Sequence, residues 1–315
     1  MQKKLVVLGG GTGSSVLLKG LKDYPVDITS VVSVCDDGRS TGRLRKEFNT
    51  IAVGDLRKVL VSMAETEPLV EELFNYRFDT TSDLDGHAVG NILLTAMLNI
   101  KGNASECIES LGKVLNLKGK ILPLTEDYVV LMGKTSEGKI IEGEANITKC
   151  PDKIIDVFYK EKPTINKAII ESLEEADAIL LSMGSLFTSI LPNLISEDII
   201  EAIDKSKAKI IYVCNLMSQP GETEELKASD HVKFLNAHLG KKKINTVLVN
   251  NGFIDEKALK KYETKEQKGL VEVDSKELNR IVKKVITNDY VTVIDDVIRH
   301  NAAKLSIDIM SDIID

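Results

Sequence analysis

Short apolar runs alternate with amphipathic segments along most of the chain. The runs are rich in valine, isoleucine and leucine and have the length of buried strands, whereas the segments between them repeat apolar residues at helical spacing. Strands are predicted at residues 4–8, 28–34, 178–183, 209–215 and 246–252, and helices at residues 16–22, 52–60, 69–78, 89–100, 104–115, 165–175, 196–205 and 230–239. This alternation predicts an α/β fold with a Rossmann-like, doubly wound and mostly parallel sheet.

The alternation is interrupted between residues 121 and 160, where short strands are expected at residues 128–134, 140–148 and 154–159. A glycine-containing turn, Ser136-Glu137-Gly138, separates the first two of these strands. We interpret the stretch as a small antiparallel β insertion that carries no obvious chemistry. The predicted organisation is a single Rossmann-like nucleotide-binding domain over residues 1–315, with the insertion at about residues 121–160.

The first predicted strand runs directly into a glycine-rich turn, Gly9-Gly10-Gly11-Thr12-Gly13, and then into a helix that Ser14 and Ser15 can cap. Glycines let a ligand approach the backbone, and a helix N-terminus attracts anions. The turn is not a P-loop, and Ser14 replaces the third glycine of a dinucleotide fingerprint. We predict an anion-binding turn. The alternative is a tight strand–helix connection without a ligand.

The second predicted strand ends in Asp36-Asp37-Gly38, followed by Arg39, Arg43 and Arg45 in what we interpret as a flexible turn. An acid at this position could hold ribose hydroxyls in a dinucleotide fold or magnesium in a phosphoryl-transfer enzyme. The arginines could clamp phosphate in either case, and the alternative is a solvated charged turn. Asp55 is expected to cap the helix at residues 52–60, and it gains chemical interest only if the fold brings it to Asp37.

Other polar groups also follow predicted strands. They include Gly184-Ser185, Asn215 with Gln219 and Gly221, and Asn250. Because the carboxyl ends of parallel strands meet at one edge, where ligands bind at the point of strand-order reversal, these groups should lie together. His87 and Asn91 open an apolar helix, so they need partners, either as a structural cap or in a ligand contact.

Composition narrows the function classes. The net charge of −7, the low aromatic content of 4% and the absence of tryptophan disfavour nucleic acid and anionic membrane as partners. The four cysteines lack Cys-x-x-Cys spacing, which disfavours a zinc site and a disulfide framework. With no transmembrane-length run and no signal peptide, the expected location is cytoplasmic.

Short polar motifs are spread over almost the whole chain. They are Gly9-Gly10-Gly11-Thr12-Gly13, Asp36-Asp37-Gly38, Gly42-Arg43-Leu44-Arg45, Gly54-Asp55-Leu56-Arg57, Gly86-His87-Ala88 with Gly90-Asn91, Gly184-Ser185-Leu186-Phe187-Thr188-Ser189, Asn215 with Gln219-Pro220-Gly221-Glu222-Thr223, and Arg299-His300. In this order they resemble the gluconeogenesis factor family, bacterial cytoplasmic proteins related to 2-phospho-L-lactate transferase. Three segments depart from the family pattern, Arg39, Ser182-Met183 and Asn301-Ala302.

The resemblance implies a Rossmann-like fold that binds a UDP-sugar, typically UDP-N-acetylglucosamine. It also implies a role in cell shape and cell-wall (peptidoglycan) synthesis during growth on gluconeogenic carbon sources. No catalytic activity is established for that branch, so we expect a nucleotide-sugar-binding regulator. The sister transferases join a phospholactate to a guanosine nucleotide with magnesium held by acids that match Asp37 and Asp55. A magnesium-dependent nucleotide transferase is therefore the alternative. An NAD-linked oxidoreductase is the weakest reading, because the fingerprint is broken.

We expect the ligand to be held by residues at the strand ends. The glycine turn would hold the diphosphate, Asp37 a metal or ribose, and the amides the base or sugar. The full predicted set is Gly10, Gly11, Thr12, Gly13, Asp37, Arg43, Asn91, Gly184, Ser185, Thr188, Asn215 and Gln219. No catalytic residue is assigned, and Arg299 either closes the site or is a surface charge.

No cofactor is expected to be required. Mg²⁺, held by Asp37 and Asp55, is expected only if the protein is a transferase. The expected partners are a small-molecule nucleotide sugar and a protein of cell-wall synthesis, and a homo-oligomer is compatible with the fold.

Overall fold

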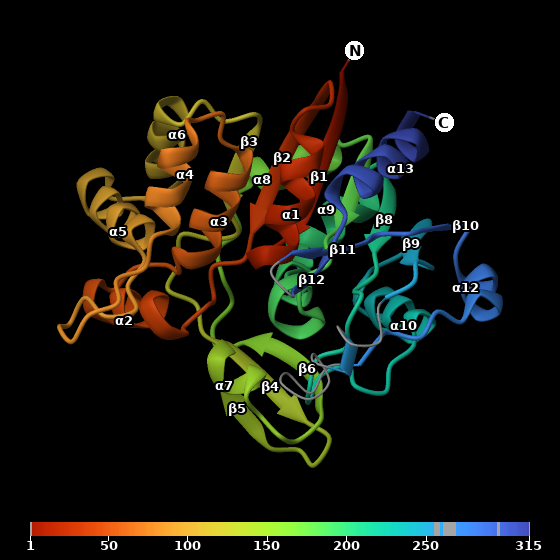
Figure 1. Cartoon of the computed structure of the whole chain (residues 1–315). Helices are drawn as coiled ribbons and strands as arrows, with labels where there is room; N and C mark the ends of the chain where they lie inside the picture. The colour runs from red at the N-terminus through yellow and green to blue at the C-terminus, as the bar shows by residue number, and fades with distance from the viewer. Residues whose placement is uncertain (1, 255–258, 261–268, 295–296, 315) are drawn as a thin grey trace.

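A seven-stranded parallel sheet forms the centre of the molecule (Figure 1). The computed structural model describes residues 2–254, 259–260, 269–294 and 297–314. The strands are β1 (Lys3–Gly9), β2 (Val26–Val32), β3 (Lys120–Pro123), β7 (Ala178–Leu181), β8 (Lys209–Val213), β9 (Thr246–Asn250) and β10 (Lys284–Asn288). Their order is β10-β9-β8-β7-β1-β2-β3, and every pairing is parallel. The predicted doubly wound α/β fold is confirmed, with the strand order reversing between β1 and β7.

Helices cover both faces of this sheet. On one face α1 (Gly11–Leu21) packs between α3 (Gly54–Met63) and α13 (Ala302–Ile314). On the other face lie α8 (Lys167–Glu174), α9 (Glu197–Lys205), α10 (Ala228–His238) and α12 (Ser275–Ile281). Right-handed crossovers place helices on opposite faces when the chain winds outward from the centre in opposite directions. The four residues of β7 are all buried, which explains their continuous apolar run.

A cluster of further helices extends from the β3 side of the sheet (Figure 1). It consists of α2 (Arg39–Phe48), α4 (Pro68–Asn75), α5 (Val89–Lys101) and α6 (Ala104–Val114). The expectation of a flexible turn at residues 39–45 is wrong. Residues 39–48 form α2, which buries Leu44 and also Arg45, whose guanidinium donates to the carbonyls of Cys35 and Val129. These hydrogen bonds satisfy the buried charge, so an arginine-rich segment can pack as a helix.

The antiparallel insertion is also confirmed. Its strands are β4 (Leu131–Thr135), β5 (Ile140–Glu142) and β6 (Ile154–Tyr159), in the order β5-β4-β6. The strand expected at residues 140–148 is wrong beyond residue 142, because Gly143, with φ of +94°, turns the chain into α7 (Glu144–Thr148). In Figure 1 this unit lies below the carboxyl ends of the parallel strands. Residues 120–123, at the expected start of the insertion, form β3 of the main sheet instead.

Besides α12 and β10, where no element was predicted, two further features were missed. One is the hairpin of β11 (Val291–Ile294) and β12 (Val297–His300), which forms its own two-stranded sheet. The other is a π-helical turn, η1 (Leu186–Ile190), followed by the short 3₁₀ turn η2 (Leu191–Asn193). Among the described residues, no helix combines the length and apolarity that crossing a membrane requires.

Candidate functional site

A cavity of about 370 Å³ opens at the carboxyl edge of the sheet, next to the point where strand order reverses. Four strand-end loops line it, those after β1, β2, β7 and β8, together with residues of α3, α7 and β12. Parallel sheets bind ligands at this place because the strand order reverses there and leaves a crevice between diverging loops. The predicted convergence is seen for the loops after β1, β2, β7 and β8. It is wrong for Gly221 and Asn250, which do not line the cavity; Asn250 Oδ1 instead accepts from the Gly252 and Tyr290 amides at 3.2 and 2.9 Å.

The glycine turn leads into α1 at one wall of the cavity. Gly10 is the N-cap of α1 and no side chain caps this helix end. The serines expected to cap it are engaged elsewhere. Ser14 lies 2.7 Å from Ser182 Oγ, and Ser15 donates to the Gly11 carbonyl at 2.9 Å. The first turn of α1 therefore lines the cavity through Gly11, Thr12 and Gly13 without a capping side chain between it and a ligand.

Two of the glycines lie in close contact with other segments. A Cβ on Gly13 would lie 2.4 Å from the Met183 carbonyl oxygen, and a Cβ on Gly10 would lie 2.7 Å from Asp55 Oδ2. Gly13 is thus required by the approach of α1 to the loop after β7. At Gly10 the nearest atom is the end of the Asp55 side chain, which lies against the glycine turn and would have to move if a Cβ were added.

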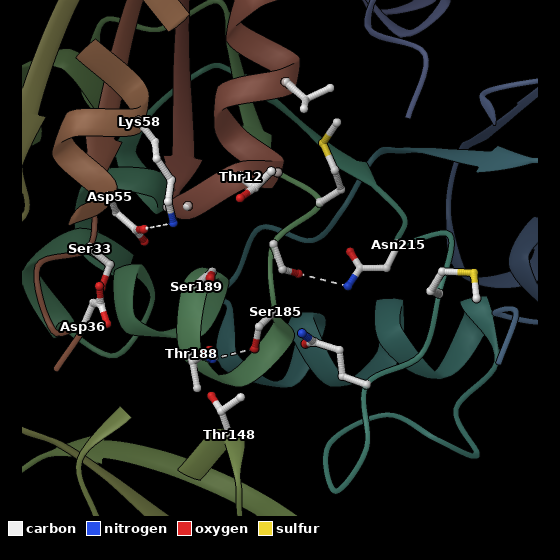
Figure 2. A pocket seen from close by; sticks show the side chains of 18 of the residues that line it. Thr12, Ser33, Asp36, Asp55, Lys58, Thr148, Ser185, Thr188, Ser189 and Asn215 are labelled. Atoms are coloured by element: carbon white, nitrogen blue, oxygen red, sulfur yellow. Dashed lines mark hydrogen bonds and ion pairs between the residues drawn. The ribbon is translucent and has the colours of Figure 1, made fainter. Parts of the chain in front are cut away.

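A cluster of charged side chains forms one side of the cavity, where Figure 2 shows Asp36, Asp55 and Lys58 close together. Asp55 was expected to be the N-cap of α3, but the N-cap is Val53 and Asp55 lies in the first turn of the helix. The Asp55 carboxylate pairs with Lys58 Nζ at 2.9 Å. Burial, and then the Asp55 charge, raises the pKa of Asp36. Burial and the charges of Asp36 and Asp55 raise the pKa of Glu144 to about 8. A cation or a proton would relieve this concentration of negative charge.

Asp37 points away from this cluster. Its Oδ1 accepts a hydrogen bond from the Ala145 amide at 2.7 Å, in the first turn of α7, and Asp37 does not line the cavity. Adjacent residues of an extended chain point in opposite directions, so only one of the two acids can face Asp55. The structure places Asp36 there.

Amide and hydroxyl groups line the opposite side, where Figure 2 shows Asn215, Ser185 and Thr188. Asn215 Nδ2 donates to the Gly184 carbonyl at 2.9 Å. Ser185 Oγ donates to Glu222 Oε2 at 2.6 Å and accepts from the Thr188 amide at 3.0 Å. Within the described part of the chain, the buried Oδ1 of Asn215 and the buried Oε1 of Gln219 have no hydrogen-bond partner. Buried acceptors are rarely unpaired, so these two oxygens are suited to donors on a ligand.

Besides Asp37, the sequence candidates Arg43, His87 and Asn91 also lie outside the cavity. The Arg43 guanidinium donates to the carbonyls of Asp83 and Asp85 in the loop before α5. Asn91 Nδ2 donates to Ser40 Oγ at 3.2 Å, and the same hydroxyl lies 3.0 Å from His87 Nδ1. His87 and Asn91 thus share Ser40 as a partner inside the protein, and neither caps α5, whose N-cap is Ala88.

The hairpin strand β12 completes the cavity with Ile298, Arg299 and His300. His300 Nε2 lies 3.1 Å from the Cys214 carbonyl oxygen, and burial lowers the pKa of His300 to about 4. Arg299 is exposed at the rim.

Sequence reasoning missed several lining residues. Glu144 and Thr148 come from the insertion, to which no chemistry was assigned, and Lys58 follows Asp55 by one helical turn. Lys58 had a signal, because i,i+3 spacing places it beside Asp55. Glu144 had none, since the sequence does not indicate where the insertion folds.

The comparisons with known proteins agree over nearly the whole chain. The family described as 2-phospho-L-lactate transferase CofD matches residues 5–291. The gluconeogenesis factor of Bacillus subtilis is 44% identical over 304 residues, covering 96% of each chain. That of Halalkalibacterium halodurans is 44% identical over 308 residues, covering 97% of this chain and 95% of the relative.

A solved structure shows the same fold. A crystal structure of a Bacillus halodurans protein superposes with a TM-score of 0.95 at 43% sequence identity, covering 98% of this chain and 100% of that one. Its agreement extends to the whole α/β architecture. The chain therefore belongs to the 2-phospho-L-lactate transferase CofD family, and its curated relatives at 44% identity are gluconeogenesis factors.

Proposed function

We propose that this protein is a regulator that binds UDP-N-acetylglucosamine in the cavity. Its role would lie in cell shape and cell-wall synthesis during gluconeogenic growth, in the cytoplasm and through a protein partner. The names of the relatives support the link to gluconeogenesis. The observation that carries the ligand is the pair of unpaired buried acceptors, Asn215 Oδ1 and Gln219 Oε1. The imide N–H of uracil and the amide N–H of an acetylated amino sugar are donors of the kind these oxygens need.

The rest of the cavity suits the other parts of such a ligand. The uncapped N-terminus of α1 can receive a diphosphate through backbone N–H groups and the helix dipole. Ser185 and Thr188 can hydrogen-bond sugar hydroxyls or a phosphate.

Isothermal titration with UDP-N-acetylglucosamine, with and without Mg²⁺, tests the proposal, with GTP and NAD as comparators. We expect selective, metal-independent binding at one site. Gln219→Met keeps the side-chain length but removes the acceptor, and it should weaken binding about tenfold. The matched control is Gln2→Met, on the exposed amino edge of the sheet, which should leave affinity unchanged. Absence of binding by the wild-type protein would refute the proposal.

The biological role needs a separate test in cells. A strain lacking this protein should grow poorly and lose its normal shape on a gluconeogenic carbon source. The wild-type chain and Gln2→Met should restore both properties, whereas Gln219→Met should not. Equal rescue by all three variants would separate the cellular role from ligand binding.

A magnesium-dependent nucleotide transferase is the second candidate, favoured by the acidic side of the cavity. Among the described residues, no group of three or more His, Cys, Asp or Glu side chains is arranged to hold a metal ion. Magnesium often takes only one or two carboxylates, together with water and substrate phosphates. The facing acids Asp36 and Asp55 fit that description, and bound Mg²⁺ would neutralise phosphate charge there.

Neighbouring substitutions test the metal role. Asp36→Asn should abolish any magnesium dependence of GTP or UDP-sugar binding. Asp37→Asn, one residue away, should leave it intact, because Asp37 contacts α7 instead. If binding does not depend on magnesium in the wild type or in either variant, the metal role is excluded and the regulator hypothesis is retained.

A further inference from the structure

Helix α4 is apolar on two sides. Phe74 faces inward and is buried in a small apolar cluster beneath the helix. Leu69, Leu73 and Tyr76 follow one another at i, i+4 and i+7, and they are 72%, 49% and 55% exposed. Leu69 and Leu73, one turn apart, lie on one side of α4 and are turned away from the core, and Tyr76, the C-cap residue, follows them at the helix end. Such a stripe is unusual for a surface helix, whose outer side is normally polar.

Helix α5 repeats this arrangement next to α4. Leu94 is buried, whereas Leu93 and Ile100 are 39% and 74% exposed. The two helices pack against each other, and the Val89 amide at the start of α5 donates to the Tyr76 carbonyl at 2.9 Å. Figure 1 shows α5 as the helix farthest from the sheet on this side of the molecule. We call the exposed apolar side chains of this helix pair the outer face; its members are Leu69, Leu73, Tyr76, Leu93 and Ile100.

A buried guanidinium keeps the two helices in place. Arg57 of α3 is only 5% exposed. It donates to Asn91 Oδ1 at 2.9 Å in α5 and to the Phe74 carbonyl at 3.2 Å in α4, and it also donates to Asn75 Oδ1. These bonds join three helices, so they fix α4 and α5, which carry the outer face, relative to each other. A preorganised surface loses little conformational entropy when a partner binds.

Acidic residues accompany the α4 part of the outer face, with Glu67, Glu71 and Glu72 in or next to that helix. Seven acidic residues and one arginine, Arg77, occur between residues 65 and 85. Two of the acids are paired with lysines of other elements, Glu65 with Lys118 and Glu71 with Lys19. The guanidinium of Arg77 donates to the Gly86 carbonyl in the same loop. The excess negative charge would repel a second copy of this face and attract a basic partner.

We propose that the outer face docks a protein partner through a basic amphipathic helix of that partner. The partner helix would place apolar side chains at i, i+3 or i+4 and i+7 against the outer face. Its flanking lysines or arginines would meet these acidic residues. Recognition of an amphipathic helix by an apolar surface with complementary charge at the rim is a recurring mode of protein association. This surface lies apart from the cavity, so its docking does not depend on the identity of the ligand.

Fluorescence anisotropy with a synthetic amphipathic helix of leucine and lysine tests this proposal. The matched probe is the same peptide with every lysine replaced by glutamate. The wild-type chain should bind the lysine peptide and not the glutamate peptide. The double variant Leu69→Ser, Leu73→Ser should bind it at least about tenfold more weakly, because its two anchors are lost. Ile307→Ser is the control, since Ile307 is 56% exposed on α13, outside the outer face.

A charge-reversed variant separates docking from general attraction to an acidic protein. The double variant Glu67→Lys, Glu72→Lys should bind the lysine peptide more weakly than the wild type does, and it should bind the glutamate peptide. Equal affinity of the wild type and the double serine variant for the lysine peptide would overturn the proposal. So would sedimentation showing a wild-type dimer that the serine substitutions dissociate, because the outer face would then join two copies of this chain.

Discussion

At the residue scale, a glycine in a ligand-binding turn can be required by packing rather than by the ligand. Gly13 lines the cavity, yet a Cβ there would overlap the backbone of Met183 and Gly184. We expect Gly13→Ala to destabilise the fold by about 1–3 kcal/mol, as overpacking does. Urea unfolding measures the change, with Gly269→Ala as control because its added Cβ would meet no atom closer than 3.7 Å. Equal stability of the two variants would contradict this packing role.

Glu144 supplies a pH-dependent prediction at the same scale. Its folded-state pKa of about 8 lies above the ordinary 4.5, because burial and neighbouring acids favour the protonated form. The native state therefore holds a proton that the unfolded state releases, so this group lowers stability progressively as pH rises from 4.5 to about 8. Glu144→Gln removes the effect. Its melting temperature should exceed that of the wild type by a margin that grows across this window.

Melting curves at several pH values check this margin. The matched control is Glu142→Gln on β5, whose side chain is largely exposed and paired with Lys160. A difference between Glu144→Gln and wild type that stays constant with pH would show that Glu144 titrates normally in the folded protein.

At the element scale, buried arginines join helices that apolar contacts alone do not orient. Arg57 links α3 to the end of α4 and to Asn91 of α5. Lysine keeps the charge but lacks the planar fork, so Arg57→Lys should leave buried acceptors unpaired and reduce stability by about 2–3 kcal/mol. Chemical denaturation measures the loss. Arg280→Lys, at a side chain that is 78% exposed, should change stability by less than about 0.5 kcal/mol.

At the scale of the whole molecule, the cavity and the contacts that hold the last helix lie at opposite edges of the sheet. The cavity lies at the carboxyl edge, whereas the last helix, α13, is fastened at the amino edge by Asp312. This carboxylate is 2% exposed, pairs with Lys284 Nζ at 2.8 Å and accepts from Thr246 Oγ1 at 3.0 Å. Asp312→Asn should therefore lower stability by about 1–3 kcal/mol without altering ligand affinity.

Thermal unfolding and titration calorimetry on the same preparation test both halves of this expectation. Asp289→Asn, at a half-exposed carboxylate paired with Lys304, is the control and should change stability little. A loss of affinity in Asp312→Asn that persists well below its melting temperature would show that the amino edge influences the cavity.

The sequence predicted the central architecture because parallel strands buried on both faces must be continuous apolar runs. The runs at residues 178–183 and 209–215 correspond to β7 and β8 for this reason. The hairpin β11–β12 lacked such a signal, since its residues are only partly buried. Helix α2 was missed because its arginines suggested a solvated turn, whereas Arg45 is buried against backbone carbonyls.

The sequence alone determined that several strand-end loops lie at one edge, because parallel strands direct all their carboxyl ends there. The glycine turn, Ser185, Asn215 and Gln219 line one cavity as a result. The tertiary structure decided what the strand order leaves open. It turned Asp36 rather than Asp37 toward Asp55, and it brought Glu144 of the insertion into the cavity. Both outcomes depend on side-chain direction and on contacts between distant segments, which local periodicity does not encode.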